Sequence, residues 1–254
     1  MPEKRKTINN EHIVSVSKYI DFVQSLKEVN ELQGNFTELL FRGQGIDKPL
    51  IPKIGRLNLR IKTDIQNTER LILDEFKRGI LPLSEFKPDN QWDLLALAQH
   101  HGLPTRLLDW SYSALIALWF AVEKAPVEEN GQQQNGVVWI LSAQTEDFRT
   151  DITTAKPLDN NITKIFRSSV ISRRISAQSG VFTIHKILKN DKMVKFEVNK
   201  TYKNKLTKLL VKPSDFAKLR KELSLLGVHH ASVFPDIDGF CKNLEWRFAK
   251  QKDE

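Results

Sequence analysis

Apolar residues recur at helical spacing in the first half of the chain. Three segments alternate apolar and polar residues so that one side of a helix would be hydrophobic, and a fourth is apolar on every side. These segments are 14–29, 68–78, 91–99 and 114–122. Asn90 is a suitable N-cap for the third helix, and the fourth is expected to lie inside the core.

The remaining apolar pattern predicts short strands, most of them in the second half. They are rich in β-branched or aromatic residues and cover 38–42, 136–142, 180–185, 192–198 and 207–211. A further helix is predicted to begin at the N-cap Ser214 and to end at Gly227. Because helices come early and strands late, we expect an α+β fold in which a helical N-terminal half packs on a twisted, mainly antiparallel sheet.

Composition supports a globular protein and gives no sign of a membrane. The chain has 254 residues, of which 40% are hydrophobic and 28% charged, which is enough apolar material for a core. The longest apolar run, 114–122, is far shorter than the roughly 20 residues that a membrane-spanning helix needs. A charged N-terminus and the single cysteine, Cys241, favour a cytoplasmic protein.

The net charge of +8 is concentrated in one segment. Residues 186–221 hold twelve basic and three acidic residues, so this stretch accounts for the whole excess. Such a surface attracts nucleic acid or another anionic macromolecule, although a solvated face is an equally good interpretation. The residues predicted to bind an anionic partner are Lys192, Lys195, Lys203, Lys205 and Lys208.

Common catalytic and metal motifs are missing. Gly43-Gln44-Gly45 begins like a dinucleotide fingerprint, but Lys48 stands where the third glycine belongs. The histidines occur as adjacent pairs, 100–101 and 229–230, whose side chains point in different directions, so no metal site is predicted.

Polar residues inside apolar sequence are the best candidates for a site. Arg42 ends the strand LLFR, where a guanidinium either binds an anionic ligand or forms a core salt bridge, with Asp109 as a candidate partner. The segment 101–111 brings together an unusual number of ionisable and polar groups between apolar runs, which favours function over structure. These groups are His101, Thr105, Arg106, Asp109 and Ser111.

Four ordered motifs carry a resemblance to a known family. They are Phe41-Arg42-Gly43-Gln44, then AQHHGLPTRLLDWSYSALIALWFAV at 98–122, QSGVFT at 178–183 and LGVHHASVFPDIDGF at 226–240. Together they resemble the FRG domain family of bacteria and phages over about 41–244. The resemblance predicts an FRG domain over 36–254, preceded by a helical lead-in over 1–35.

The order of these motifs is also similar to that of ADP-ribosyltransferases. Enzymes of that fold carry an arginine or histidine on a first strand, a hydroxyl-bearing strand that leads into a helix, and usually a glutamate on a late strand. These groups hold NAD in a cleft between two half-sheets. The resemblance implies a split sheet here, with NAD as the substrate. Gln178 stands at the late position and carries no negative charge.

The resemblance implies roles for named residues. Arg42, His101 and Gln178 are the predicted catalytic residues. Independently of the resemblance, Arg173, Arg174 and Gln178 precede the predicted strand 180–185 and are candidates for phosphate or ribose contacts. The predicted NAD-binding residues are Arg42, Gly43, Gln44, Thr105, Arg106, Asp109 and Ser111.

Three functional hypotheses follow. The first is an NAD-dependent ADP-ribosyltransferase-like toxin or phage-defence effector, whose basic face recruits an anionic target and which a cognate partner or antitoxin protein accompanies. The second is a non-catalytic module that binds nucleic acid or protein, in which Arg42, Arg106 and Asp109 form a buried network. The third is a metal-independent nuclease that uses His101 as a general base oriented by Asp109.

Overall fold

The computed structural model describes residues 11–32, 37–59, 64–83, 87–152, 155–169, 176–188 and 190–253. Arg173 and Arg174 lie outside these described residues. The described helices are α1 (Val16–Leu32), α2 (Ile65–Gly79), α3 (Gln91–His100), α4 (Ala114–Val122), α6 (Phe216–Leu225), α7 (His230–Val233) and α8 (Ile237–Phe248). Short 3-10 turns include η1 (Lys53–Arg56), η4 (Phe196–Val198) and η5 (Pro213–Asp215).

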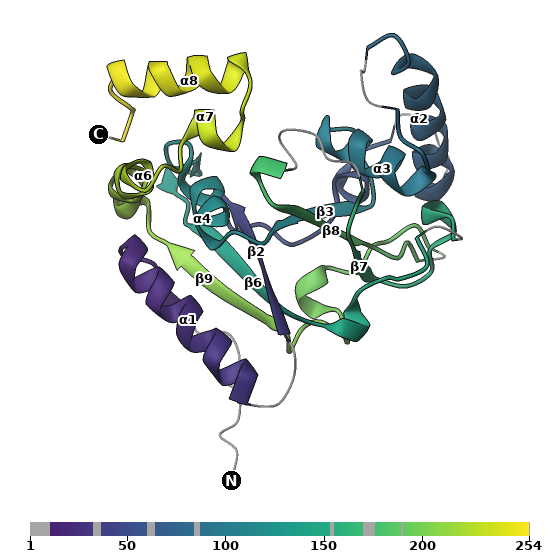
Figure 1. The fold of residues 1–254 in the computed structure, drawn as a ribbon, viewed down its shortest axis with the longest axis horizontal. Helices are drawn as coiled ribbons and strands as arrows, with labels where there is room; N and C mark the ends of the chain where they lie inside the picture. The colour runs from purple at the N-terminus through teal and green to yellow at the C-terminus, as the bar shows by residue number, and fades with distance from the viewer. Residues whose placement is uncertain are drawn as a thin grey trace.

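A seven-stranded sheet forms the centre of the molecule (Figure 1). Its strands are β1 (Glu11–His12), β2 (Thr37–Gln44), β3 (Leu107–Ser111), β6 (Gly136–Gln144), β7 (Lys164–Phe166), β8 (Gly180–Ile184) and β9 (Leu206–Val211). They lie in the order β1-β9-β6-β2-β3-β8-β7, and only the β1–β9 pairing is parallel. A small hairpin of β4 (Glu128–Glu129) and β5 (Gln132–Gln133) stands apart. The expected α+β fold with a mainly antiparallel sheet is confirmed.

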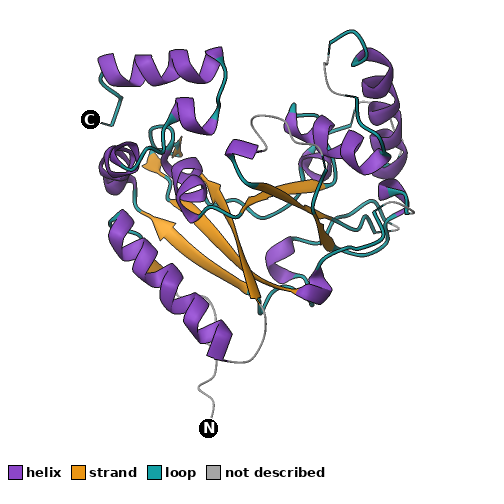
Figure 2. Cartoon of the chain, viewed as in Figure 1, coloured by secondary structure: helices purple, strands orange, loops and turns teal. Residues whose placement is uncertain are grey.

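The sheet is divided into two halves that meet at one point. β2 pairs with β6 along its whole length, from Thr37 to Gln44, and β3 pairs with β8 over all of its five residues. Between β2 and β3, by contrast, the described register consists of the single pair Phe41 and Ser111. The two groups of strands consequently run at an angle to each other, as Figure 2 shows. The divided sheet leaves space beside the junction.

Helices cover the two halves separately. α1, α4 and α6 share a hydrophobic cluster with β6 and β9, and the Tyr19 hydroxyl of α1 donates to the Ala114 carbonyl at 3.1 Å. α2 and α3 pack on β3, β7 and β8 through residues that include Leu73, Trp92 and Phe182. Each half-sheet therefore has its own helical layer, and the gap between the halves lies between those layers.

The predicted strand over 192–198 is wrong. This segment ends in η4, and Phe196 is buried while Val194 and Val198 are exposed. Its alternating apolar residues reflect one buried aromatic anchor, whose backbone N–H donates to the Leu50 carbonyl at 2.9 Å, rather than a strand face. The apolar pattern did not predict β1, β3, β4, β5, β7, α7 or α8, although the resemblance implied a strand where β3 lies. No helix among the described residues is long and apolar enough to cross a membrane.

Candidate functional site

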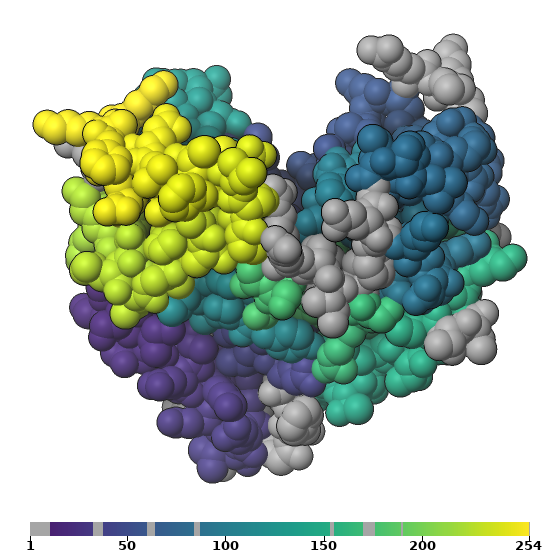
Figure 3. Space-filling view, turned by 45° about the horizontal axis from the view of Figure 1, so that its top comes forward, coloured from purple at the N-terminus to yellow at the C-terminus, as the bar shows by residue number. Residues whose placement is uncertain are grey.

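A pocket of about 320 Å³ opens where the two half-sheets meet. Its volume is in the range of small-molecule sites, and it combines an aromatic wall with several polar groups. In Figure 3 the molecular surface is hollowed between the yellow C-terminal helices and the blue region of α2 and α3. The lining residues are Phe41, Arg42, Gly43, Gln99, His100, Asp109, Trp110, Ser111, Ala117, Phe120, Gln178 and Phe234.

Arg42 extends from β2 into this pocket. Its Nη1 donates to the backbone carbonyl of Asp109 at 2.7 Å and lies 3.7 Å from the Oδ2 of the same residue. Its buried Nε has no hydrogen-bond partner among the described residues. Burial lowers the pKa of Arg42, Asp109 raises it, and the nearby cation Arg56 lowers it. Because an arginine stays protonated under these influences, Arg42 brings a positive charge with unused donor capacity to the pocket.

Asp109 occupies the facing position on β3. Its Oδ2 accepts a hydrogen bond from Gln99 Nε2 at 2.8 Å, and Gln99 Oε1 in turn accepts one from the Thr105 hydroxyl at 2.6 Å. About 52% of the Asp109 side chain is solvent accessible, but the residue lines a concave pocket. The surrounding pocket wall desolvates the carboxyl and raises its pKa, while Arg42 and Gln99 oppose the rise.

Ser111 links the end of β3 to Gln178. The Ser111 hydroxyl donates to the Gln178 carbonyl at 2.7 Å and accepts from the backbone N–H of Ser113 at 2.9 Å. Gln178 Nε2 donates to the Val233 carbonyl at 3.3 Å. Gln178 precedes β8 by two residues, and these contacts bring it from the far half-sheet into the same pocket as Arg42.

Gly43 is required by packing at the pocket floor. A Cβ on this residue would lie 1.8 Å from the Ala117 carbonyl oxygen of α4. The missing side chain therefore allows α4 to approach β2, and this approach fixes the backbone that carries Arg42.

Comparison with protein families matches residues 37–130 of this chain to the FRG domain. An FRG domain is thus present over residues 37–130. The match includes β2, α2, α3, β3 and α4, so most of the pocket belongs to it, whereas Gln178 and Phe234 lie beyond its end. The curated proteins and the solved structures contain no significant match.

Three of the predicted NAD-binding residues lie outside the pocket lining. Gln44 accepts from Trp139 Nε1 at 3.2 Å, and Thr105 lies behind Gln99. Arg106 is 1% exposed and forms an ion pair with Glu69, which is equally buried, at 2.6 Å. This corrects the expectation that Arg106 contacts a ligand. Gly43, Asp109 and Ser111 do line the pocket.

His100, rather than His101, faces the pocket of the FRG domain. His101 is exposed at the C-cap of α3, where the helix ends. Sequence reasoning also missed Gln99 and the aromatic residues Phe120 and Phe234. Gln99 and His100 lie in the family motif and could have been found there, but Phe234 joins the site through tertiary folding alone.

The predicted basic residues divide into two groups. Lys205 pairs with the buried Asp147 at 2.7 Å, while Lys208 pairs with Asp47 at 2.5 Å and lies over the Trp139 ring. Lys192, Lys195 and Lys203 are exposed, and none of them forms an ion pair with another described residue. Three of the five predicted lysines are thus available at the surface.

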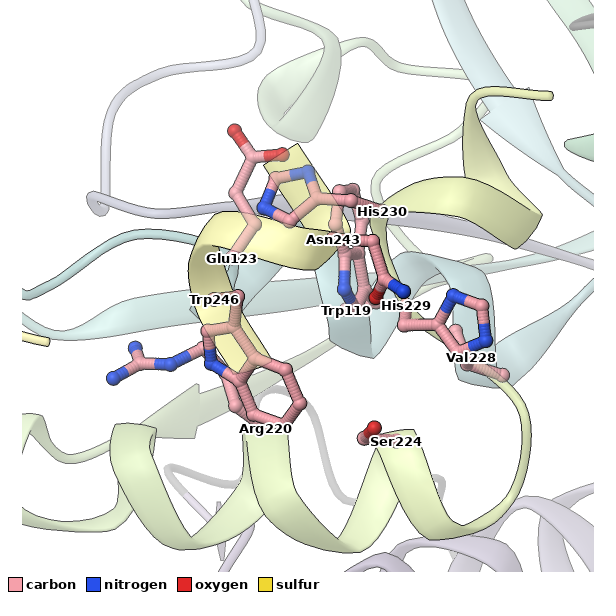
Figure 4. Close-up of a pocket in the computed structure, with 9 residues that line it drawn as sticks. All are labelled: Trp119, Glu123, Arg220, Ser224, Val228, His229, His230, Asn243 and Trp246. Atoms are coloured by element: carbon pink, nitrogen blue, oxygen red, sulfur yellow. The ribbon is translucent and has the colours of Figure 1, made fainter. Parts of the chain in front are cut away.

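A second cavity lies beneath α7 and α8 (Figure 4). Its volume of about 10 Å³ is enough for one water molecule at most. The His230 ring packs edge-on against Trp119 with centroids 4.9 Å apart, and burial lowers its pKa.

Within the described part of the chain, no cluster of three metal-ligating side chains is present.

Proposed function

We propose that the FRG domain binds NAD in this pocket and cleaves it in an ADP-ribosyltransferase-like reaction. The observation that carries the proposal is that Arg42, Ser111 and Gln178 meet in one pocket at the junction of two half-sheets. Their order along the chain is that of the residues that hold NAD in the enzymes this chain resembles.

The chemistry of the pocket fits a dinucleotide. Arg42, with Arg56 nearby, offers positive charge and free donors for a pyrophosphate. The Phe120 and Phe234 rings of the same pocket lie edge to face with centroids 6.1 Å apart and provide an apolar wall for a heteroaromatic ring. Positive charge develops on the ribose as nicotinamide leaves, and the polar groups of Asp109 and Gln178 are in the pocket to stabilise it.

The experiment is incubation of the full chain with labelled NAD and a bacterial lysate, following free nicotinamide and label transferred to protein, DNA and RNA. The wild type should release nicotinamide, and Arg42→Ala should lose this activity because the anion-binding donors are removed. The variant must stay folded, which its circular dichroism spectrum checks. If folded wild type leaves NAD intact, the proposal is refuted.

The exposed lysines support a further element of the proposal, an anionic target. Lys192, Lys195 and Lys203 would attract nucleic acid to the surface. Reversing their charges to glutamate should reduce the transfer of label to a nucleic acid while leaving nicotinamide release unchanged.

The roles in toxicity or phage defence, and a cognate antitoxin, follow from the family resemblance. Growth of cells that express wild type or Arg42→Ala tests them.

The alternative hypotheses receive less support from the contacts. The binding-module hypothesis requires Arg42, Arg106 and Asp109 in one network, but Arg106 pairs with Glu69 instead. The nuclease hypothesis requires Asp109 to orient His101, whereas the side-chain partners of Asp109 among the described residues are Arg42 and Gln99. Loss of RNA from the lysate without NAD would favour the nuclease.

A further inference from the structure

The proposed NAD chemistry leaves one requirement unassigned, a base for the proton of the attacking group. A hydroxyl that attacks the ribose must lose its proton, and a neutral glutamine at position 178 is a poor acceptor for it. Among the described residues that line the pocket, Asp109 is the one with a carboxyl group. Asp109 on the neighbouring strand β3 therefore offers the negative charge that Gln178 lacks.

The contacts of Asp109 leave part of the carboxylate available. Gln99 and Arg42 both approach Oδ2, at 2.8 and 3.7 Å. The backbone N–H of Asp109 also donates to the carboxylate, and about half of the side chain is accessible from solvent. Gln99 is itself fixed by Thr105. The carboxylate is therefore held in a defined orientation, while about half of the side chain stays accessible to a bound molecule.

Asp109 also lies beside the residues that would hold the substrate. It is two positions before Ser111 on β3, so both side chains project from the same face of the strand. Ser111 contacts Gln178, and Arg42 contacts Asp109. The carboxylate consequently shares one pocket with the proposed anion-binding group and the late-strand residue.

We infer that Asp109 is the catalytic base of the proposed reaction and fills the role that Gln178 cannot. This inference rests on the proposed function. An acceptor hydroxyl or a water molecule attacks the C1′ atom of the ribose, and the new C–O bond replaces the bond to nicotinamide. The electron pair of the broken C–N bond goes to nicotinamide, and the proton of the attacking oxygen goes to Asp109.

The surroundings of Asp109 define its expected pH dependence. Among the described residues, the charged or titratable groups near it are Arg42 of β2 and His100 of α3, and Arg56 of η1 and His185 interact in turn with Arg42. The residues that α4 and the segments before β8 and after α7 contribute to the pocket do not titrate. Desolvation raises the pKa of Asp109. The rate should therefore begin to fall on the acid side, the acid limb of the profile, at a higher pH than it would with an ordinary aspartate.

The test compares nicotinamide release by wild type, Asp109→Asn and the double variant Asp109→Asn/Gln178→Glu over a range of pH. We expect Asp109→Asn to lower kcat by about 10² or more, to lose the acid limb, and to keep its affinity for NAD. The double variant should recover part of the rate, since it returns a carboxylate to the late position. Asp159→Asn is the matched control, because Asp159 does not line the pocket and forms an exposed ion pair with Arg70.

The outcomes separate this inference from the proposed function. If wild type cleaves NAD but Asp109→Asn keeps its rate and its acid limb, the assignment of Asp109 is overturned and the proposed function stands. If the acid limb disappears in His100→Gln instead, His100 is the base and the assignment is again overturned. Absence of nicotinamide release by wild type overturns both. A purely structural role for Asp109 would lower stability and NAD affinity and would not be relieved by Gln178→Glu.

Discussion

Two arginines of the FRG domain, Arg42 and Arg106, each have a carboxylate partner, yet their surroundings differ. Arg106 and Glu69 are both 1% exposed, and Glu69 accepts hydrogen bonds from the backbone and the side chain of Arg106. Each arginine has one nitrogen without a hydrogen-bond partner among the described residues, but Arg42 and Asp109 line the pocket, are 3.7 Å apart, and have side chains that are 19% and 52% exposed. The first pair is closed to any ligand, whereas the second is open to one.

The difference shows how one motif serves both folding and the site. A fully buried ion pair is costly to form and very costly to break, because removing one partner leaves an uncompensated charge. A pair with an exposed member is weakly stabilising, since water replaces the lost contact. Arg106 therefore joins α2 to β3, and Arg42 is free to exchange its partner for an anion.

The largest effect is expected from Arg106→Met. Glu69 would remain buried without its partner, and we expect a loss of about 3–5 kcal/mol in the free energy of unfolding. Urea denaturation followed by circular dichroism measures it. The double variant Arg106→Met/Glu69→Leu is the control and should recover much of the loss, because it removes both charges. A single variant as stable as wild type would contradict this interpretation of the buried pair.

A smaller loss is expected from Gly43→Ala, which alters the support beneath Arg42. The new methyl group would meet the Ala117 carbonyl at 1.8 Å, so α4 must shift and the cost should be about 1–3 kcal/mol. The matched control is Gly45→Ala, where the nearest atom would be 3.9 Å away. The difference in thermal unfolding between the two variants is the measurement. Equal stability would show that α4 does not constrain β2 at this point.

The pH dependence of stability should report on the buried His185 behind the pocket. Burial, assisted by the charge of Arg42, lowers the pKa of this residue to about 3. The unfolded chain binds the proton near pH 6.5, so between these values the unfolded state holds more protons and stability falls as pH falls. The expected slope is about 1.4 kcal/mol per pH unit from this group.

His185→Gln is the variant that checks this slope. Trp110 Nε1 donates to the Thr183 hydroxyl, which leaves that hydroxyl free to donate to a neutral His185 ring at 2.9 Å. A glutamine can accept the same hydrogen bond without titrating. Urea denaturation between pH 4 and 7 should show a shallower decline for the variant, and an unchanged slope would mean that the histidine is protonated in the folded state.

Local sequence explains the elements whose pattern and packing agree. The predicted helix over 114–122 coincides with α4, because an unbroken apolar run follows the N-cap Ser113. By contrast, β3 was not predicted, since Asp109 interrupts its apolar residues in order to face the pocket. The strand predicted over 192–198 failed because one buried phenylalanine, not a strand face, gives that segment its alternation.

The site was predictable in its residue types and less so in its geometry. The alternative that Arg42 pairs with Asp109 is confirmed by their contact. His100 reaches the pocket instead of the predicted His101 because α3 ends at His100, and a shift of one residue turns a side chain by about 100°. Phe234 and Gln178 reach the pocket from distant parts of the chain, so only the tertiary fold brings them there.

The smallest effect on stability is expected from Arg42→Met, which completes the comparison of the two arginines. Asp109 is half exposed and keeps its hydrogen bond from Gln99, so water can solvate its charge when the guanidinium is lost. We expect a loss of no more than about 1 kcal/mol, against several for Arg106→Met. Urea denaturation of both variants under one set of conditions gives the comparison. Because the methionine fills a similar volume and carries no donor, loss of NAD cleavage in a protein of near-normal stability would assign Arg42 to function. A loss as large as that of Arg106→Met would instead make both arginines part of the structural core.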